Sequence, residues 1–121
     1  MIAGGLLAES IRVGASLEGV PLRVVRIWRA DAGDPDAGQP RTWTFIDFEV
    51  EDDMADALAS ALSEVLAPGS WYCDFRSDSE TFVVFKDRVF RYRRRDAAGR
   101  SEVERYARSV GVPEAQLDWP E

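Results

Sequence analysis

The chain contains no histidine and a single cysteine, Cys73, among its 121 residues. Histidine is the commonest general base at neutral pH and the commonest metal ligand in proteins. Its absence excludes Ser-His-Asp and Cys-His hydrolase mechanisms and argues against a zinc site. One cysteine cannot form an internal disulfide, which fits a reducing compartment. We therefore expect a cytoplasmic protein without a metal or cofactor, in which any catalysis would depend on carboxylates, tyrosine, arginine or the cysteine.

Long apolar runs and phosphate-binding loops are also missing. No apolar run approaches the roughly 18 residues that span a bilayer, and no basic group precedes the short apolar stretch at the start of the chain. We expect neither membrane association nor a signal peptide. The patterns GxGxxG, Walker A and GxSxG are absent. The acidic run at residues 51–53 lacks the EF-hand spacing, so we interpret it as helix capping rather than a cation site.

Basic residues are too few to balance the acids, and the net charge is −7. This charge disfavours non-specific binding to phosphate backbones. The distribution is uneven: residues 31–64 carry ten acids and one base, whereas residues 76–108 carry ten bases and six acids. A partner protein would meet two different faces, or the two blocks pair with each other within the fold.

The chain has the length of one domain, and we predict a single domain over residues 1–121. Residues 1–20 form a weakly determined lead-in, because glycines interrupt their apolar pattern. Residues 31–40 form a flexible acidic loop rich in glycine and proline, which we interpret as a hairpin connection. Alternating or β-branched segments predict strands at 22–29, 41–50, 71–76, 81–85 and 88–93. Apolar residues at helical spacing predict helices over about 53–67 and 97–110.

The element order ββαβββα predicts an α+β fold. Hairpin connections make the sheet of about five strands mostly antiparallel, and two amphipathic helices need one face of it to lie on. We therefore predict a two-layer sandwich with two helices on one face. Its element order is loosely similar to the ferredoxin-like plait, with an extra strand in the middle and no clear final strand.

This arrangement leaves the other sheet face rich in aromatic side chains. The alternation places on it Trp43, Phe45, Tyr72, Asp74, Arg76, Val83, Phe85, Arg88, Phe90 and Tyr92. A contiguous apolar patch of this size is rarely exposed on a monomer. We expect a second copy of the chain to cover it, giving a homodimer; the N-terminal 20 residues or a ligand are the alternatives.

Three functional hypotheses follow from this aromatic face. The leading one is a small non-catalytic binding or assembly protein that dimerises through the face and can bind a protein partner. The alternative is a small-molecule sensor or a histidine-independent enzyme with a pocket there, in which Asp74 acts as the base and Arg76 and Arg88 hold an anion. The third, single-stranded nucleic-acid binding by Phe85, Phe90 and the nearby arginines, is disfavoured by the net charge. Cys73 is interpreted as a buried, inert residue.

Overall fold

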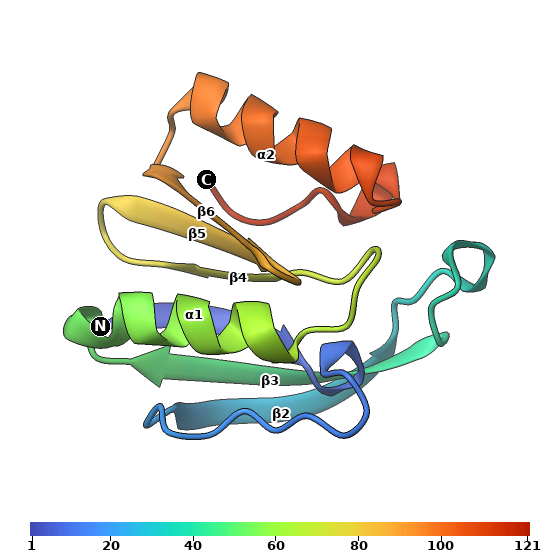
Figure 1. Ribbon diagram of the computed structural model, residues 1–121, viewed down its shortest axis with the longest axis horizontal. Coiled ribbons are helices and arrows are strands. Elements are labelled where there is room, and N and C mark those ends of the chain that lie inside the picture. The colour runs from blue at the N-terminus through green and yellow to red at the C-terminus, as the bar shows by residue number, and fades with distance from the viewer.

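A six-stranded antiparallel sheet organises the computed structural model, which describes residues 1–121 (Figure 1). The strands are β1 (Ile2–Leu7), β2 (Arg23–Asp31), β3 (Thr42–Val50), β4 (Cys73–Arg76), β5 (Glu80–Phe85) and β6 (Arg88–Arg93), and the helices are α1 (Ala55–Val65) and α2 (Ala97–Ser109). The strands are arranged in the order β2-β3-β1-β4-β5-β6. The predicted α+β class and antiparallel sheet are confirmed, but the ferredoxin-like order is not. Neither helix is long and apolar enough to cross a membrane.

The N-terminal strand β1 lies at the centre of the sheet, between β3 and β4. The sequence predicts only a weakly determined lead-in here, because Gly14 and Gly19 interrupt the apolar pattern of residues 1–20. The structure gives Gly4 a specific role: a Cβ at this position would lie 2.6 Å from the Cβ of Phe75 and 2.7 Å from the carbonyl oxygen of Asp74. Glycine therefore allows the neighbouring strand to approach closely.

The two helices lie on opposite faces of the sheet, so the prediction of two helices on one face is wrong (Figure 1). Along β5, Phe82 and Val84 belong to the cluster that contains the apolar side chains of α1. The alternate residues Val83 and Phe85 belong to the cluster that contains those of α2. Residues 81–85 are all buried, and a strand without a polar alternate face is typical of a sheet covered on both sides.

The strand register and helix limits agree closely with the sequence pattern. Cys73 pairs with Val84, and Val84 pairs with Val89, which is the register that turns at residues 77–80 and 86–87 between the predicted strands give. The side chain of Asp96 caps α2 by accepting hydrogen bonds from the backbone N–H groups of residues 98 and 99. A short 3₁₀ turn, Asp52–Met54, precedes α1 and contributes acidic residues to its N-terminus.

The acidic loop (residues 31–40) connects β2 to β3, as predicted for a hairpin connection. It is held by local contacts rather than left without structure: Asp34 caps the 3₁₀ turn Pro35–Ala37. At its base, the Gly33 N–H donates to the carbonyl oxygen of Arg41 over 2.9 Å. A Cβ at Gly33 would lie 1.7 Å from the carbonyl oxygen of Pro40, so only glycine fits this closure.

Candidate functional site

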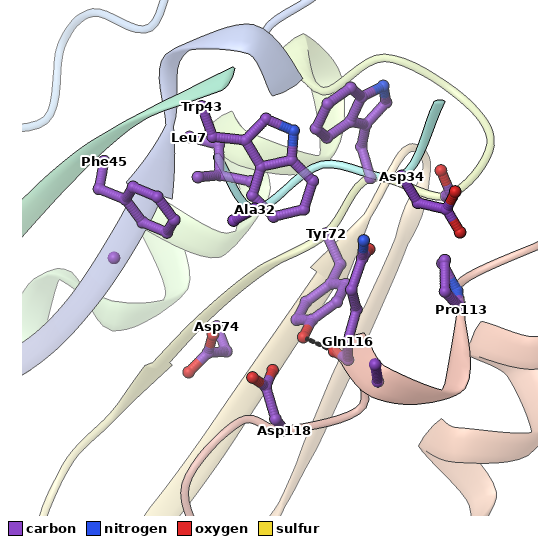
Figure 2. Close-up of a pocket in the computed structure, with 14 residues that line it drawn as sticks. Leu7, Ala32, Asp34, Trp43, Phe45, Tyr72, Asp74, Pro113, Gln116 and Asp118 are labelled. Atoms are coloured by element: carbon purple, nitrogen blue, oxygen red, sulfur yellow. Dashed lines mark hydrogen bonds between the residues drawn. The ribbon is translucent and has the colours of Figure 1, made fainter. Parts of the chain in front are cut away.

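A cavity of about 470 Å³ opens on the sheet face that carries α2, beside the helix (Figure 2). We call it the cleft. Its floor is formed by the sheet and by the residues just before β4, one wall by the acidic loop and the other by the C-terminal tail (residues 112–121). The fourteen lining residues are Gly5, Leu7, Ala32, Asp34, Trp43, Phe45, Ser70, Trp71, Tyr72, Asp74, Pro113, Ala115, Gln116 and Asp118.

The floor of the cleft is open because Gly5 has no side chain. Gly5 pairs with Asp47 on one side and with Asp74 on the other. In an antiparallel sheet, directly paired residues project from the same face. Gly5 therefore leaves a gap between two carboxylate-bearing strands. The carboxylate of Asp47 already has a hydrogen-bond donor, because the Trp28 Nε1–H donates to its Oδ2 over 3.0 Å.

Aromatic rings form a continuous row along one side of the cleft. The ring centroids of Trp28 and Phe45 lie 4.0 Å apart in a stacked arrangement. Trp43 follows, with its centroid 6.1 Å from that of Phe45 and 5.6 Å from that of Trp71. The Trp43 indole is 8% exposed, and its Nε1–H has no hydrogen-bond acceptor. This row gives the cleft a rigid apolar side.

The rim is fixed by a buried amide, Gln39, that joins the acidic loop to the tail. Its Nε2 donates to the Ser70 Oγ and to the Gln116 Oε1, each over 3.0 Å. Its Oε1 accepts from the Gln116 Nε2 over 2.8 Å and from the backbone N–H of Asp34 over 3.0 Å. The hydroxyl of Tyr72 donates to the carbonyl oxygen of Gln116. Because every one of these groups is partnered, the two walls are held at a set separation.

Carboxylates dominate the electrostatics of the cleft, which no lysine or arginine lines. Burial raises the pKa of Asp74 to about 6, against the opposing charge of Arg76 and with a smaller contribution from the nearby Asp118. The Arg76 Nη1 lies 3.6 Å from the Asp74 Oδ2. Burial, followed by the charge of Asp74, also raises the pKa of Tyr72. The carboxyl group of Asp74 thus changes charge close to neutral pH.

Asp74 and Asp118 lie together at one end of the cleft, and Asp34 lies at the other (Figure 2). The structure contains no group of acidic or cysteine side chains arranged to hold a metal ion. The arrangement can instead hold an organic ligand between the aromatic side and the carboxylates, because such a cavity supplies apolar contact together with a few directed polar groups.

The predicted aromatic face is divided between the cleft and the interior. Of the nine candidate residues, four line the cleft: Trp43, Phe45, Tyr72 and Asp74. Three others, Phe85, Phe90 and Tyr92, are buried against α2 and the tail. The predicted exposure of these three is wrong, because α2 lies on their side of the sheet.

The two candidate arginines do not converge. The Arg88 guanidinium lies 4.7 Å from the ring centroid of Phe90 in β6 and 5.1 Å from that of Tyr106 in α2, and it does not line the cleft. Arg76 instead accompanies Asp74 in β4. The anion-holding arginine pair expected from the sequence is therefore not formed.

Sequence reasoning missed the residues that the tail and the loops contribute. Alternation over the predicted strand 71–76 would place Trp71 on the same face as Cys73, but β4 begins at Cys73, so strand alternation does not apply to the residue two positions before it. Gln116 and Asp118 carry no local signal for a cleft; only the aromatic Trp119 beside them indicates that the tail packs against the body. Trp119 is buried, and its Nε1–H donates to the Tyr92 hydroxyl over 2.7 Å.

Cys73 is buried on the α1 side, as predicted, and its thiol contacts the carbonyl oxygen of Gly5 over 3.3 Å. Burial raises the pKa of this thiol, which opposes a nucleophilic role. Comparison with protein-family models, with curated proteins and with solved structures gives no match to this chain. The functional argument therefore depends on the geometry of the cleft.

Proposed function

We propose that this protein is a small-molecule-binding domain whose ligand occupies the cleft. The observation that supports this proposal is a cavity of about 470 Å³ in which four aromatic residues and three carboxylates converge. Ligand sites in proteins are typically concave, mostly apolar and about 300–1,000 Å³ in volume, with a few polar groups that fix orientation. This is the second of the three hypotheses that the sequence supports.

The leading hypothesis, assembly through the aromatic face, loses the argument on which it depended. Its premise was that two helices on one side leave Phe85, Phe90 and Tyr92 without cover, whereas all three pack against α2 and the tail. The same burial removes the platform that single-stranded nucleic acid would need for base stacking. We assign a binding role; in an enzymatic variant of the proposal, Asp74 would be the group that exchanges a proton.

The proposal is tested by adding a fragment set of cationic, neutral and anionic compounds to the ¹⁵N-labelled protein. Binding in the cleft shifts the indole N–H resonances of Trp43 and Trp71. The variant Ala115→Phe places a ring in the cleft from the exposed start of the tail and should abolish these shifts. Ala98→Phe, an exposed position on α2, is the matched control and should retain them. Shifts that survive Ala115→Phe, or none with any fragment, contradict the proposal.

Homodimerisation is a second proposed property, supported by the free edge of β2. This strand pairs with β3 alone, and Val24, Val25 and Ile27 are 51%, 55% and 64% exposed. Antiparallel pairing of two β2 strands about Ile27 would place Arg23 opposite Asp31 of the second copy, so the charges at the ends of the strand are complementary. We place such a dimer in the reducing cytoplasm, where the buried thiol of Cys73 stays free.

Sedimentation at increasing concentration tests this edge pairing. The expected result is a dimer that Ile27→Lys converts to a monomer, because a lysine would be buried at the centre of the new pair. Glu102→Lys, on the exposed side of α2, is the control for the added charge. A monomer at all concentrations would mean that the arginines of β2 block the edge.

A further inference from the structure

We propose that the cleft selects an organic cation, a protonated amine carried on an apolar or aromatic body. This inference rests on the proposed function and adds the charge class of the ligand to it. The site is the cavity itself; its carboxylates and aromatic rings decide which ligand it accepts.

The balance of charge around the cavity favours a cation. Asp34, Asp74 and Asp118 line it, and no basic side chain does. The nearest arginine on the tail side is already engaged: Arg100 donates to the carbonyl oxygen of Trp119 over 2.8 Å and to that of Leu117 over 3.1 Å. A carboxylate ligand would enter among three like charges, whereas an ammonium group would replace water beside them.

The aromatic side of the cleft favours the same charge. The rings of Trp43, Phe45 and Trp71 follow one another along it, and the faces of such rings carry negative potential that attracts cations. The same sheet face already contains one such contact, because the Arg26 guanidinium lies 4.5 Å from the ring centroid of Trp28. A ligand that is both apolar and cationic would therefore use both sides of the cavity at once.

Asp74 makes the binding sensitive to pH. The groups that face it are Arg76 from its own strand, Tyr72 from the residues just before that strand, Asp47 across Gly5, Asp118 from the tail and Arg100 from α2. Burial and Asp118 hold its pKa above the ordinary range, so the carboxyl group is largely neutral at pH 5 and charged at pH 7.5. An alkyl amine stays protonated over this range, as a lysine side chain does. The amine should therefore bind more tightly as the pH rises.

Three probes of matched size test the selection: 2-phenylethylamine, 2-phenylethanol and 3-phenylpropanoate. Each is titrated into the full chain while the indole N–H resonances of Trp43 and Trp71 are recorded. We expect the amine to bind about tenfold more tightly than the alcohol, with 3-phenylpropanoate the weakest of the three. The affinity of the amine should rise between pH 5 and pH 7.5, and that of the alcohol should stay constant.

The variant Asp74→Asn keeps the shape of the side chain and removes its charge. This variant should weaken the binding of the amine about tenfold at pH 7.5, abolish the pH dependence of that binding and leave the affinity for the alcohol unchanged. Asp53→Asn, an exposed carboxylate beside α1, removes the same charge far from the cleft and should leave all three affinities unchanged. The folded state of each variant is checked from the dispersion of its spectrum.

Each other outcome contradicts the inference. If the alcohol or 3-phenylpropanoate binds as tightly as the amine, or if Asp74→Asn leaves the amine unaffected, the cleft does not select a cation. If fragments of other chemistry shift Trp43 and Trp71 while the amine does not, the inference fails and the proposed function stands. If nothing in the fragment set binds, both fail.

Discussion

The two halves of one sheet face use the same kinds of residue for different purposes. Over β4, β5 and β6, the aromatic side chains Phe85, Phe90 and Tyr92 are covered by α2 and the tail and form a second hydrophobic core. Over β3, β1 and the residues before β4, the aromatic side chains Trp43, Phe45 and Trp71 line a cavity. The difference comes from the helix, whose single apolar side is too narrow to cover six strands (Figure 1).

The comparison shows that an aromatic patch is not by itself an interface. Its covered half contributes to folding, as the ring contacts of Phe85 with Tyr106 and Phe90 at 4.9 and 6.0 Å indicate. Its open half is kept open by groups that hold the walls apart, chiefly Gln39 and Gln116. Substitutions in the covered half should therefore affect stability, and substitutions in the open half should affect the cleft.

The largest expected effect is on the covered half. Phe85→Ala removes a fully buried ring, and we expect it to lower the free energy of unfolding by about 3–5 kcal/mol. Phe45→Ala is the matched substitution in the open half; its ring is only half-buried, and we expect a loss of about 1 kcal/mol. Urea denaturation followed by far-UV circular dichroism measures both. Equal losses would mean that the two halves do not differ in the way proposed.

The sequence predicts those parts of the fold that depend on local signals. The register from β4 to β6 follows from the turns at residues 77–80 and 86–87, and both helices follow from their apolar stripes. Asp96 also marks the start of α2 as its cap, whereas no acidic side chain of residues 51–53 caps α1. The sequence does not predict the face on which α2 lies, because a stripe shows that a helix buries one side and does not show against which side of a sheet. It does not predict the central position of β1 either, because Gly14 and Gly19 interrupt the apolar pattern of residues 1–20, and the close packing that Gly4 allows is not visible in the sequence.

A smaller effect is expected where the two halves are tied together. Gln39→Ala removes the amide that bonds the acidic loop to Ser70 and Gln116, and leaves buried polar groups without partners. We expect a loss of about 1–3 kcal/mol in the free energy of unfolding. Faster hydrogen exchange should appear in residues 32–40 and 113–118 and not in β5. Unchanged exchange in those two segments would mean that the rim does not depend on this amide.

The candidate site was predictable only in part, for the same physical reason. Strand alternation places Trp43, Phe45, Tyr72 and Asp74 on one face, and these four residues line the cleft. The remaining walls come from contacts that span most of the chain; Gln39 and Gln116 are separated by 77 positions. No local pattern specifies that pairing, because it requires the sheet, α2 and the tail to be in place first.

The last expected effect depends on pH and concerns Asp74, which lies at the boundary between the two halves. Its pKa in the folded protein, about 6, exceeds the ordinary value of 3.8, so the folded state binds the proton more tightly than the unfolded state does. The stability that this proton contributes is complete below pH 3.8 and is lost as the pH rises through about 6. Asp74→Asn stays neutral throughout, so its free energy of unfolding should lie within about 0.5 kcal/mol of the parent's at pH 4 and exceed it by about 3 kcal/mol at pH 8.

Urea denaturation at pH 4, 6 and 8 measures this difference. The effect is large because the side chain of Asp74 is only 22% exposed, so its charge is mostly removed from water in the folded protein. Asp53→Asn supplies a control of opposite sign. Asp53 lies in the acidic turn at the start of α1, where a negative charge interacts favourably with the helix dipole, so its neutralisation should cost about 0.5 kcal/mol at pH 8. If Asp74→Asn instead destabilises the protein at pH 8, the carboxylate is stabilised where it lies, and the boundary between the two halves is more polar than the structure indicates.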